Sequence, residues 1–319
     1  MIDIIIPAYN AHRFIQSTLF SITCQTISNL INVYVVNDCS DYDYSKEIYR
    51  FKSYINIKEL KTPKNIGPGG ARQYGIDHSN GKYIVFIDAD DVFNDGYSVE
   101  KLYNCIDKNN LNILTSNFNE ESEEGFEEFL YNEVWVHAKI YRRSFLEENN
   151  IRFNNSRSNE DTGFNMLISL NEEKGFPYFN DFTYIWLYNY DSITRRNNNE
   201  YDYYGMEGYA YNANWAIEEA LKRDYKKDKI ASKIFSALLC MYYAYIRFKD
   251  LDDTNGNMLL VNSKLLKIAY ENNKYYLTKK DKTEIVKSFI SESVRRIGEE
   301  KVLNNDISFY HFLDLVDKA

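Results

Sequence analysis

The sequence places three carboxylates within four residues, Asp88, Asp90 and Asp91, directly after the apolar run 84–87. Neighbouring carboxylates repel one another, and a cation bound between them relieves that repulsion. A ligand set of oxygen atoms alone suits Mg²⁺ or Mn²⁺, which keep bound waters and also bind substrate phosphates. Such an ion would neutralise the charge of a departing diphosphate. The alternative is a solvated acidic turn in which Asp91 caps the following helix.

A glycine-rich stretch is the second candidate site. Gly67, Gly69 and Gly70 lead into a predicted helix over 70–79, where their backbone N–H groups can approach a phosphate closely. The stretch is neither a P-loop, since no Gly-Lys-Ser/Thr follows, nor a dinucleotide-binding GxGxxG. Arg72 can pair with the 88–91 carboxylates or with phosphate. The alternative is a flexible turn with a surface arginine.

Short apolar runs alternate with helical patterns over the first 120 residues. They predict strands over 2–6, 33–36, 55–60, 83–87 and 113–115, and helices over 14–25, 45–54, 70–79 and 99–108. Continuous apolar runs are typical of parallel strands buried on both faces. Ligands bind beyond the carboxyl ends of such strands. We therefore expect the polar segments 7–10, 37–40, 65–72 and 88–91 to meet along one rim.

The pattern changes to helices alone from about residue 201. A 3.6-residue period predicts helices over 209–223, 228–250, 262–272, 280–297 and 307–316. We expect an α/β domain over 1–200 and an α-helical C-terminal subdomain over 201–319. The acidic stretch 120–128 is predicted to be a solvated face.

Composition excludes several classes of protein. The chain has 38 Lys and Arg against 47 Asp and Glu, a net charge of -9, which argues against general binding to nucleic acid or anionic membranes. With 44% hydrophobic residues it is not disordered. Four cysteines without a CxxC pair argue against structural zinc and for reduced thiols. No signal peptide or stretch of ~20 apolar residues is present, so we expect a cytoplasmic protein without a membrane span.

Seven motifs in this order and spacing resemble glycosyltransferase family 2, over about the first 200 residues. They are residues 4–10, 37–40, 65–75, 88–91, 134–143, 159–161 and 192–195. The resemblance implies a GT-A fold, in which a Rossmann-like nucleotide-binding sheet joins an acceptor half. It also implies an inverting transferase that uses a UDP-sugar donor and Mn²⁺ or Mg²⁺. The expected acceptor is a hydroxyl of a glycan or cell-surface polymer.

The resemblance assigns roles residue by residue. The implied nucleotide-binding residues are Pro7, Ala8, Tyr9, Asp38, Asn65, Gly67, Arg72, Asp88, Ala89, Ser192 and Arg195. Of these, Pro7 and Tyr9 would flank the base and Asp38 would bind the uracil edge. Asp90 would ligate the metal together with Asp88. Ser192 and Arg195 resemble a loop that closes over the diphosphate, although the adjacent Arg196 can serve in place of Arg195.

Asp161 resembles the general base of the family, with Glu160 shaping the acceptor pocket beside it. A carboxylate that accepts the acceptor's hydroxyl proton lowers the barrier to attack. Without the family context, the two acids would be interpreted as the cap of a helix that starts near Gly163.

The chain departs from the family pattern at several positions. Asn37 and Cys39 stand where the family commonly has Asp and Gly, and Gln73 stands where Asn is usual. His137 falls within a segment that is often Trp-Gly-Lys. Its ring can contact the sugar or acceptor, or it can be a structural histidine.

Three other classes of function are alternatives to this one. A sugar nucleotidyltransferase would have a Gly-rich, Arg-containing loop where this chain has residues 7–10. A non-catalytic protein that binds nucleotide sugars is a second alternative. A phage-type enzyme acting on a modified DNA base is the third, and it would use a basic cluster in the helical part. That cluster comprises Lys222, Arg223, Lys226, Lys227 and Lys229. The sequence sets neither the sugar, nor the acceptor, nor the oligomeric state.

Overall fold

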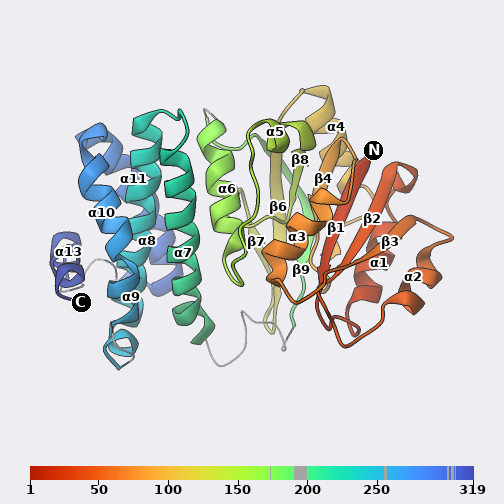
Figure 1. Ribbon diagram of the computed structural model, residues 1–319, viewed down its shortest axis with the longest axis horizontal. Helices are drawn as coiled ribbons and strands as arrows, with labels where there is room; N and C mark the ends of the chain where they lie inside the picture. The colour runs from red at the N-terminus through yellow and green to blue at the C-terminus, as the bar shows by residue number, and fades with distance from the viewer. Residues whose placement is uncertain (173, 190–199, 255–256, 300–301, 303–304, 306) are drawn as a thin grey trace. The chain divides into compact units, whose positions relative to one another are not determined.

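The computed structural model describes residues 1–319 except 173, 190–199, 255–256, 300–301, 303–304 and 306 (Figure 1). The chain forms two compact units, Met1–Tyr190 and Asp191–Ala319. The first unit is built on a sheet and the second on helices, so each is described separately.

The first unit contains one mixed sheet of nine strands. The strands are β1 (Ile2–Ala8), β2 (Ile31–Asn37), β3 (Asn56–Lys61), β4 (Tyr83–Phe86), β5 (Val92–Phe93), β6 (Ile113–Ser122), β7 (Gly125–Phe129), β8 (Lys139–Arg142) and β9 (Tyr178–Trp186). Their order is β3-β2-β1-β4-β8-β6-β9-β5, with β7 paired to β6. Strands β3, β2, β1 and β4 pair in parallel, as their continuous apolar runs predict. The other half is mixed, because β8 runs antiparallel to both β4 and β6.

Helices follow the strands of the parallel half. They are α1 (Ile15–Thr23), α2 (Ser45–Phe51) and α3 (Gly67–Asp77), which follow β1, β2 and β3. In the other half, α4 (Ser98–Lys108) follows β5, α5 (Arg143–Glu148) follows β8, and α6 (Glu160–Asn171) comes next along the chain. Helix α1 buries Ile15, Leu19 and Ile22, which its 3.6-residue period places on one face. Helix α3 packs closely on β1 because Gly75 lies against Ile5, where a side chain would not fit.

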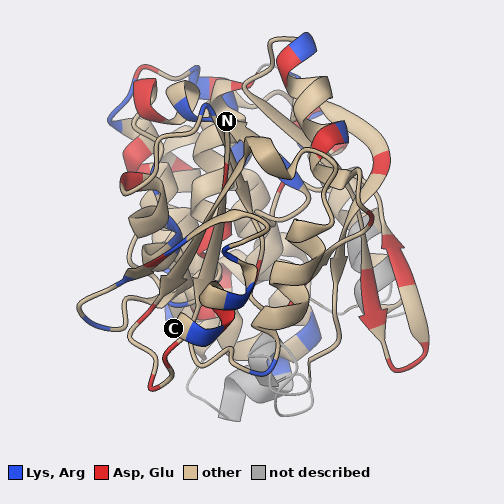
Figure 2. Cartoon of the chain, turned by 90° about the vertical axis from the view of Figure 1, so that its right-hand side faces the viewer, with Lys and Arg blue, Asp and Glu red and all other residues tan. Residues whose placement is uncertain are grey.

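One segment of the first unit differs from the sequence prediction, and a second agrees with it. Helix α3 begins at Gly67, three residues before the predicted start, because Pro68 suits a first helical turn. The acidic stretch 120–128 forms most of the β6–β7 hairpin, where the ribbon is coloured red for Asp and Glu in Figure 2. Strand β7 is exposed along most of its length, which agrees with a solvated segment.

The second unit consists of helices. They are α7 (Glu200–Leu221), α8 (Lys227–Thr254), α9 (Met258–Asn262), α10 (Lys264–Asn273), η2 (Lys274–Tyr276), α11 (Lys279–Ile297) and α13 (Phe309–Lys318). Helix α7 starts nine residues earlier than predicted, and the predicted helix 262–272 is α10 with the short α9 before it. None of the helices in the described part of the chain combines the length and the apolar character that crossing a bilayer requires.

Candidate active site

The carboxyl ends of β1, β2 and β4 meet at one edge of the sheet, because β1 pairs in parallel with both neighbours. Three of the four predicted polar segments, 7–10, 37–40 and 88–91, extend from these ends. Tyr9, just after β1, is 56% exposed and is available to a ligand. The loop 62–66 joins the same rim, since the Asn65 side chain donates to the Asp38 carbonyl oxygen at 3.4 Å. The predicted gathering of these motifs is therefore confirmed.

The Asp38 carboxylate organises the loop before α3. It accepts hydrogen bonds from the backbone N–H groups of Ile66 at 2.9 Å and Gly67 at 2.8 Å, and from the Thr62 hydroxyl at 2.8 Å. The side chain is buried. Asp38 thus fixes the start of α3, and its contact with uracil stays a prediction.

Two departures from the family pattern have local causes. Asn37 donates to Glu59 at 2.9 Å and accepts from the Ser40 N–H at 2.9 Å. An aspartate at position 37 could not donate this hydrogen bond, and its carboxylate would be repelled by that of Glu59. Cys39 has a φ of +59° and is exposed, in the left-handed conformation that favours glycine.

Arg72 is the centre of the site and is only 5% exposed. Its guanidinium donates to Asp88 Oδ1 at 2.6 Å and to Glu160 Oε1, so it joins α3, the residues after β4 and the first turn of α6. Burial by itself would lower the pKa of Arg72, but Asp88 and Glu160 outweigh it and raise the pKa. The arginine is therefore permanently charged.

The glycines of the 67–70 stretch have a packing role. Gly67 has a φ of +79°, and a Cβ on Gly69 would lie 2.8 Å from Glu160 Cβ. Glycine is needed here because α3 approaches the segment 154–160. The expected approach to phosphate is not tested by these contacts.

The carboxylates after β4 have distinct environments. Asp91 is 1% exposed and accepts from the Tyr184 hydroxyl at 2.5 Å and from the Leu187 N–H at 2.9 Å. Burial raises the pKa of Asp91 well above its usual value, and the charges of Asp90 and Asp88 add to this. The alternative, in which Asp91 is solvated and caps the following helix, is therefore wrong, because Asp91 is buried against the end of β9 and α4 starts only at Ser98.

Asp88 and Asp90 are the carboxylates that fit a divalent cation. Both side chains are partly exposed. One oxygen of Asp88 is paired with Arg72, and Asp90 Oδ2 accepts from Asn189 at 2.8 Å. Within the described residues no three metal-ligating side chains converge, so a cation here would depend on phosphate and water for its remaining ligands. That donor set, oxygen alone with open positions, suits Mg²⁺ or Mn²⁺.

Asp161 lies in the first turn of α6, which begins at Glu160 rather than near Gly163. The residue before the helix, Asn159, is left-handed and makes no side-chain cap. The Asp161 carboxylate accepts from the Thr162 N–H at 2.9 Å. Burial raises the pKa of Asp161 to about 7 and Glu160 adds to the rise, while Arg72 opposes it. A carboxyl group of this pKa can exchange protons near neutral pH.

The other wall of the site contains two buried basic side chains, to which no firm role was assigned from the sequence. Lys139, at the start of β8, is fully buried, and burial lowers its pKa to about 7 although Asp161 and Glu133 raise it. The His137 ring stacks on Tyr184 at 4.7 Å. Burial lowers the pKa of His137, and its Nε2 has no hydrogen-bond partner in the described structure. His137 is therefore a neutral, packed side chain.

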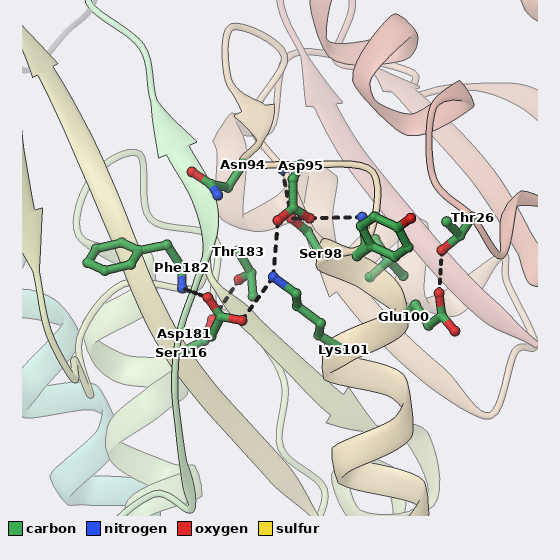
Figure 3. Close-up of polar contacts among 12 residues, drawn as sticks. Thr26, Asn94, Asp95, Ser98, Glu100, Lys101, Ser116, Asp181, Phe182 and Thr183 are labelled. Carbon is green, nitrogen blue, oxygen red and sulfur yellow. Dashed lines mark hydrogen bonds and ion pairs between the residues drawn. The ribbon is translucent and has the colours of Figure 1, made fainter.

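Strand β9, which supplies Tyr184, is held by a polar cluster away from the rim. The Lys101 ammonium lies between Asp95 at 3.0 Å and Asp181 at 2.8 Å (Figure 3). The hydroxyls of Ser116 and Thr183 share a hydrogen bond of 2.6 Å between β6 and β9. These contacts fix the strand that positions Asp91.

The structure brings together most of the predicted site residues. Pro7, Ala8, Tyr9, Asp38, Asn65, Gly67, Asp88, Ala89 and Asp90 lie along the rim, and Arg72 connects that rim to Glu160 and the adjacent Asp161. Ser192, Arg195 and Arg196 lie outside the described residues. Tyr184 and Lys139 also belong to the site, although neither was among the site residues predicted from the sequence. Lys139 falls within the motif 134–143, but nothing in the spacing of that motif marks the lysine as buried.

Comparison with known proteins gives the chain's relatives. A model of the family Glycosyl transferase family 2 matches residues 3–172, which is more than half of the chain. The poly(ribitol-phosphate) beta-N-acetylglucosaminyltransferase TarS of Staphylococcus aureus (strain Mu50 / ATCC 700699) is 25% identical over 189 residues, covering 54% of this chain and 33% of TarS. The glycosyltransferase GlyA of Streptococcus pneumoniae serotype 4 is 29% identical over 224 residues, covering 61% and 31%. The chain thus spans about a third of the length of these curated relatives.

Solved structures show the same fold. The crystal structure of S. aureus TarS 1-349 in complex with UDP-GlcNAc matches with a TM-score of 0.69 at 18% sequence identity, covering 94% of this chain and 90% of that one. The predicted fold class, a GT-A sheet followed by a helical part, is confirmed.

Proposed function

The chain belongs to glycosyl transferase family 2, and we propose that it is an inverting glycosyltransferase that moves a sugar from a UDP-sugar to a hydroxyl of a glycan or cell-surface polymer. One observation carries the proposal. Arg72 joins the carboxylates after β4 to Glu160, next to an Asp161 whose pKa is about 7. The site can thus hold the diphosphate of the donor on one side of the anomeric carbon and a base for the acceptor hydroxyl on the other side.

The residues suit a single displacement. The acceptor oxygen forms a bond to the anomeric carbon as the bond from that carbon to the diphosphate oxygen breaks, and the electron pair leaves with UDP. Asp161 accepts the proton of the attacking hydroxyl. Arg72 holds Glu160 next to Asp161. The negative charge of Glu160 makes the Asp161 carboxylate more basic.

We propose that Asp88 and Asp90 hold Mn²⁺ or Mg²⁺ together with the donor phosphates. A cation bound there would neutralise negative charge on the diphosphate. The protein's own contribution is the placement of the two carboxylates. Arg72 fixes Asp88, and Asn189 donates to Asp90.

The relatives support the donor and acceptor classes. TarS binds UDP-GlcNAc in its crystal structure, and its name describes transfer to a poly(ribitol-phosphate). Two of the five residues of the basic cluster, Lys222 and Arg223, pair with Glu219 at 2.8 and 3.5 Å, which reduces the positive charge that the cluster offers to DNA. A glycan or cell-surface polymer is therefore preferred to nucleic acid as the acceptor.

A panel of nucleotide sugars incubated with the chain and Mn²⁺ tests the proposal, with released nucleotide as the readout. We expect release of UDP from at least one UDP-sugar, slowly by hydrolysis and faster with a polymer acceptor. A protein that binds UDP-sugars but releases no nucleotide would instead be a non-catalytic binder. Retention on a DNA column at moderate salt would favour the nucleic-acid acceptor.

A further inference from the structure

Lys139 is a fully buried lysine whose role the proposed reaction does not yet include. Its ammonium donates to Asn132 Oδ1 at 2.5 Å and to the Trp135 carbonyl oxygen at 2.6 Å. Neither acceptor is charged, and no carboxylate in the described part of the chain lies within ion-pair distance. Burying an ammonium that is not paired with an opposite charge is costly. A lysine in this position therefore needs a reason beyond packing.

The hydrogen bonds of Lys139 lead to the helix that carries Asp161. The Trp135 carbonyl oxygen also accepts from Asn165 Nδ2 at 3.2 Å. Asn165 accepts from the Tyr141 hydroxyl at 3.3 Å. Because Asn165 lies four residues after Asp161, both are on one face of α6. Lys139 is thus tied, through one shared carbonyl, to the helix face that presents the proposed base.

The charges around Asp161 leave a role for a second cation. Glu160 on α6 and Asp88 after β4 disfavour its ionised form, as burial does. Arg72 on α3 favours that form, but its guanidinium is already shared between Asp88 and Glu160.

Among the described residues, strand β8 supplies two further groups near Asp161, the Tyr141 phenol and the Lys139 ammonium. Burial is the largest influence on both: it lowers the pKa of Lys139 to about 7 and raises that of Tyr141. The Asp161 charge opposes the shift of the Lys139 pKa and adds to the rise of the Tyr141 pKa. Lys139 also faces Glu133 and the neutral His137. Since the attraction between two charges is mutual, an ammonium that responds to Asp161 also stabilises the Asp161 carboxylate.

We propose, resting on the proposed function, that Lys139 is a positioning residue for the general base. Its buried positive charge favours the ionised form of Asp161, and its bond to the Trp135 carbonyl keeps the loop 132–136 against the helix face that carries Asp161. The residue touches neither substrate nor metal in this role and acts through Asp161 alone.

The pH dependence of kcat for UDP release to acceptor tests the proposal, measured for wild type and for Lys139→Met. Methionine has a similar length and no charge. We expect the apparent pKa of the acidic limb to rise by about one unit, so that kcat falls about tenfold at pH 6 and less than twofold at pH 9. The affinity for UDP with Mn²⁺ should change less than twofold.

Two further variants separate charge from structure. Lys139→Arg keeps the charge and should keep the apparent pKa close to that of wild type. Asn165→Leu breaks the shared contact at Trp135 but keeps the charge, so it should lower kcat equally at every pH. Should Lys139→Met fail to fold, as its thermal unfolding would show, Lys139→Gln replaces it, since Gln keeps a donor toward Trp135.

A loss of kcat in the neutral Lys139 variant that is equal from pH 6 to pH 9, or an unshifted profile, would overturn this inference. Failure of the proposed function gives a different result. In that case wild type releases no UDP from any UDP-sugar, or Asp161→Asn retains full activity.

Discussion

Two buried arginines lie at opposite edges of the same sheet and have different surroundings. Arg143, near the edge where β1 starts, pairs with the fully buried Asp3 at 3.0 Å and donates to the carbonyl oxygens of Gly81 and Ile76 at 2.7 and 2.9 Å. Arg72, at the carboxyl edge, donates to two carboxylates from different elements, and its Nε has no partner in the described structure.

The difference distinguishes a structural centre from a reactive one. At Arg143, two backbone carbonyls, the Ser79 hydroxyl and the Asp3 carboxylate accept from the guanidinium, and the exposed Glu147 lies 3.6 Å away. Asn32 donates to the second oxygen of Asp3 at 3.0 Å. Around Arg72, negative charges exceed positive ones, and burial shifts the pKa of Asp161 to about 7. Completed hydrogen bonds stabilise a fold, whereas crowded carboxylates at a strand end can move protons and hold cations.

Asp161→Asn is expected to have the largest effect at the reactive centre. The amide accepts no proton from the acceptor, so kcat should fall by about 10³-fold, while affinity for UDP should change less than twofold. The measurement is UDP release at saturating donor and acceptor, with UDP titration calorimetry as the control for binding. Wild-type turnover in this variant would remove Asp161 from the mechanism.

Replacing each arginine with methionine tests the comparison directly. Arg143→Met leaves Asp3 buried without its partner, so the free energy of unfolding should fall by about 3–5 kcal/mol while kcat of the folded protein is kept. Arg72→Met should lower kcat by about 10²-fold, because it releases Asp88 and Glu160. Urea unfolding and UDP release are measured on both variants. Equal losses of kcat in two folded variants would contradict the distinction.

Asp90→Ala is expected to lower the affinity for UDP in the presence of Mn²⁺ by at least about tenfold, since it removes one of the two proposed oxygen ligands. Calorimetry with and without Mn²⁺ measures this. Adding EDTA to wild type should give a comparable weakening. If Mn²⁺ strengthens UDP binding as much in the variant as in wild type, the cation does not bind at Asp90.

Cys39→Gly should have the smallest effect, a gain in the free energy of unfolding of about 0.5–1 kcal/mol. Glycine relieves the left-handed backbone at φ +59°, and its greater freedom in the unfolded chain offsets part of that gain. Urea unfolding is the measurement. Cys39→Ala is the matched control and should leave stability nearly unchanged, because alanine keeps the unfavourable φ. A gain as large in the alanine variant would point to the thiol instead.

The rim of the sheet could be predicted from the sequence because strand ends and polar motifs are local features. The partners of Asp91 could not, since Tyr184 lies 93 residues further along the chain. The packing role of Gly69 against Glu160 was missed for the same reason. Periodicity also placed the helices of the second unit, but the start of α7 at Glu200 precedes the apolar stripe that indicated it.

The dependence of kcat on pH tests the assignment of Asp161 most directly. Because burial raises the pKa of Asp161 to about 7 and the base acts when ionised, kcat should rise about tenfold per unit below pH 7 and level off above it. Residual turnover by Asp161→Asn should lack this limb. A wild-type kcat that is constant from pH 5 to pH 9, or a limb that persists unchanged in Asp161→Asn, would contradict the account.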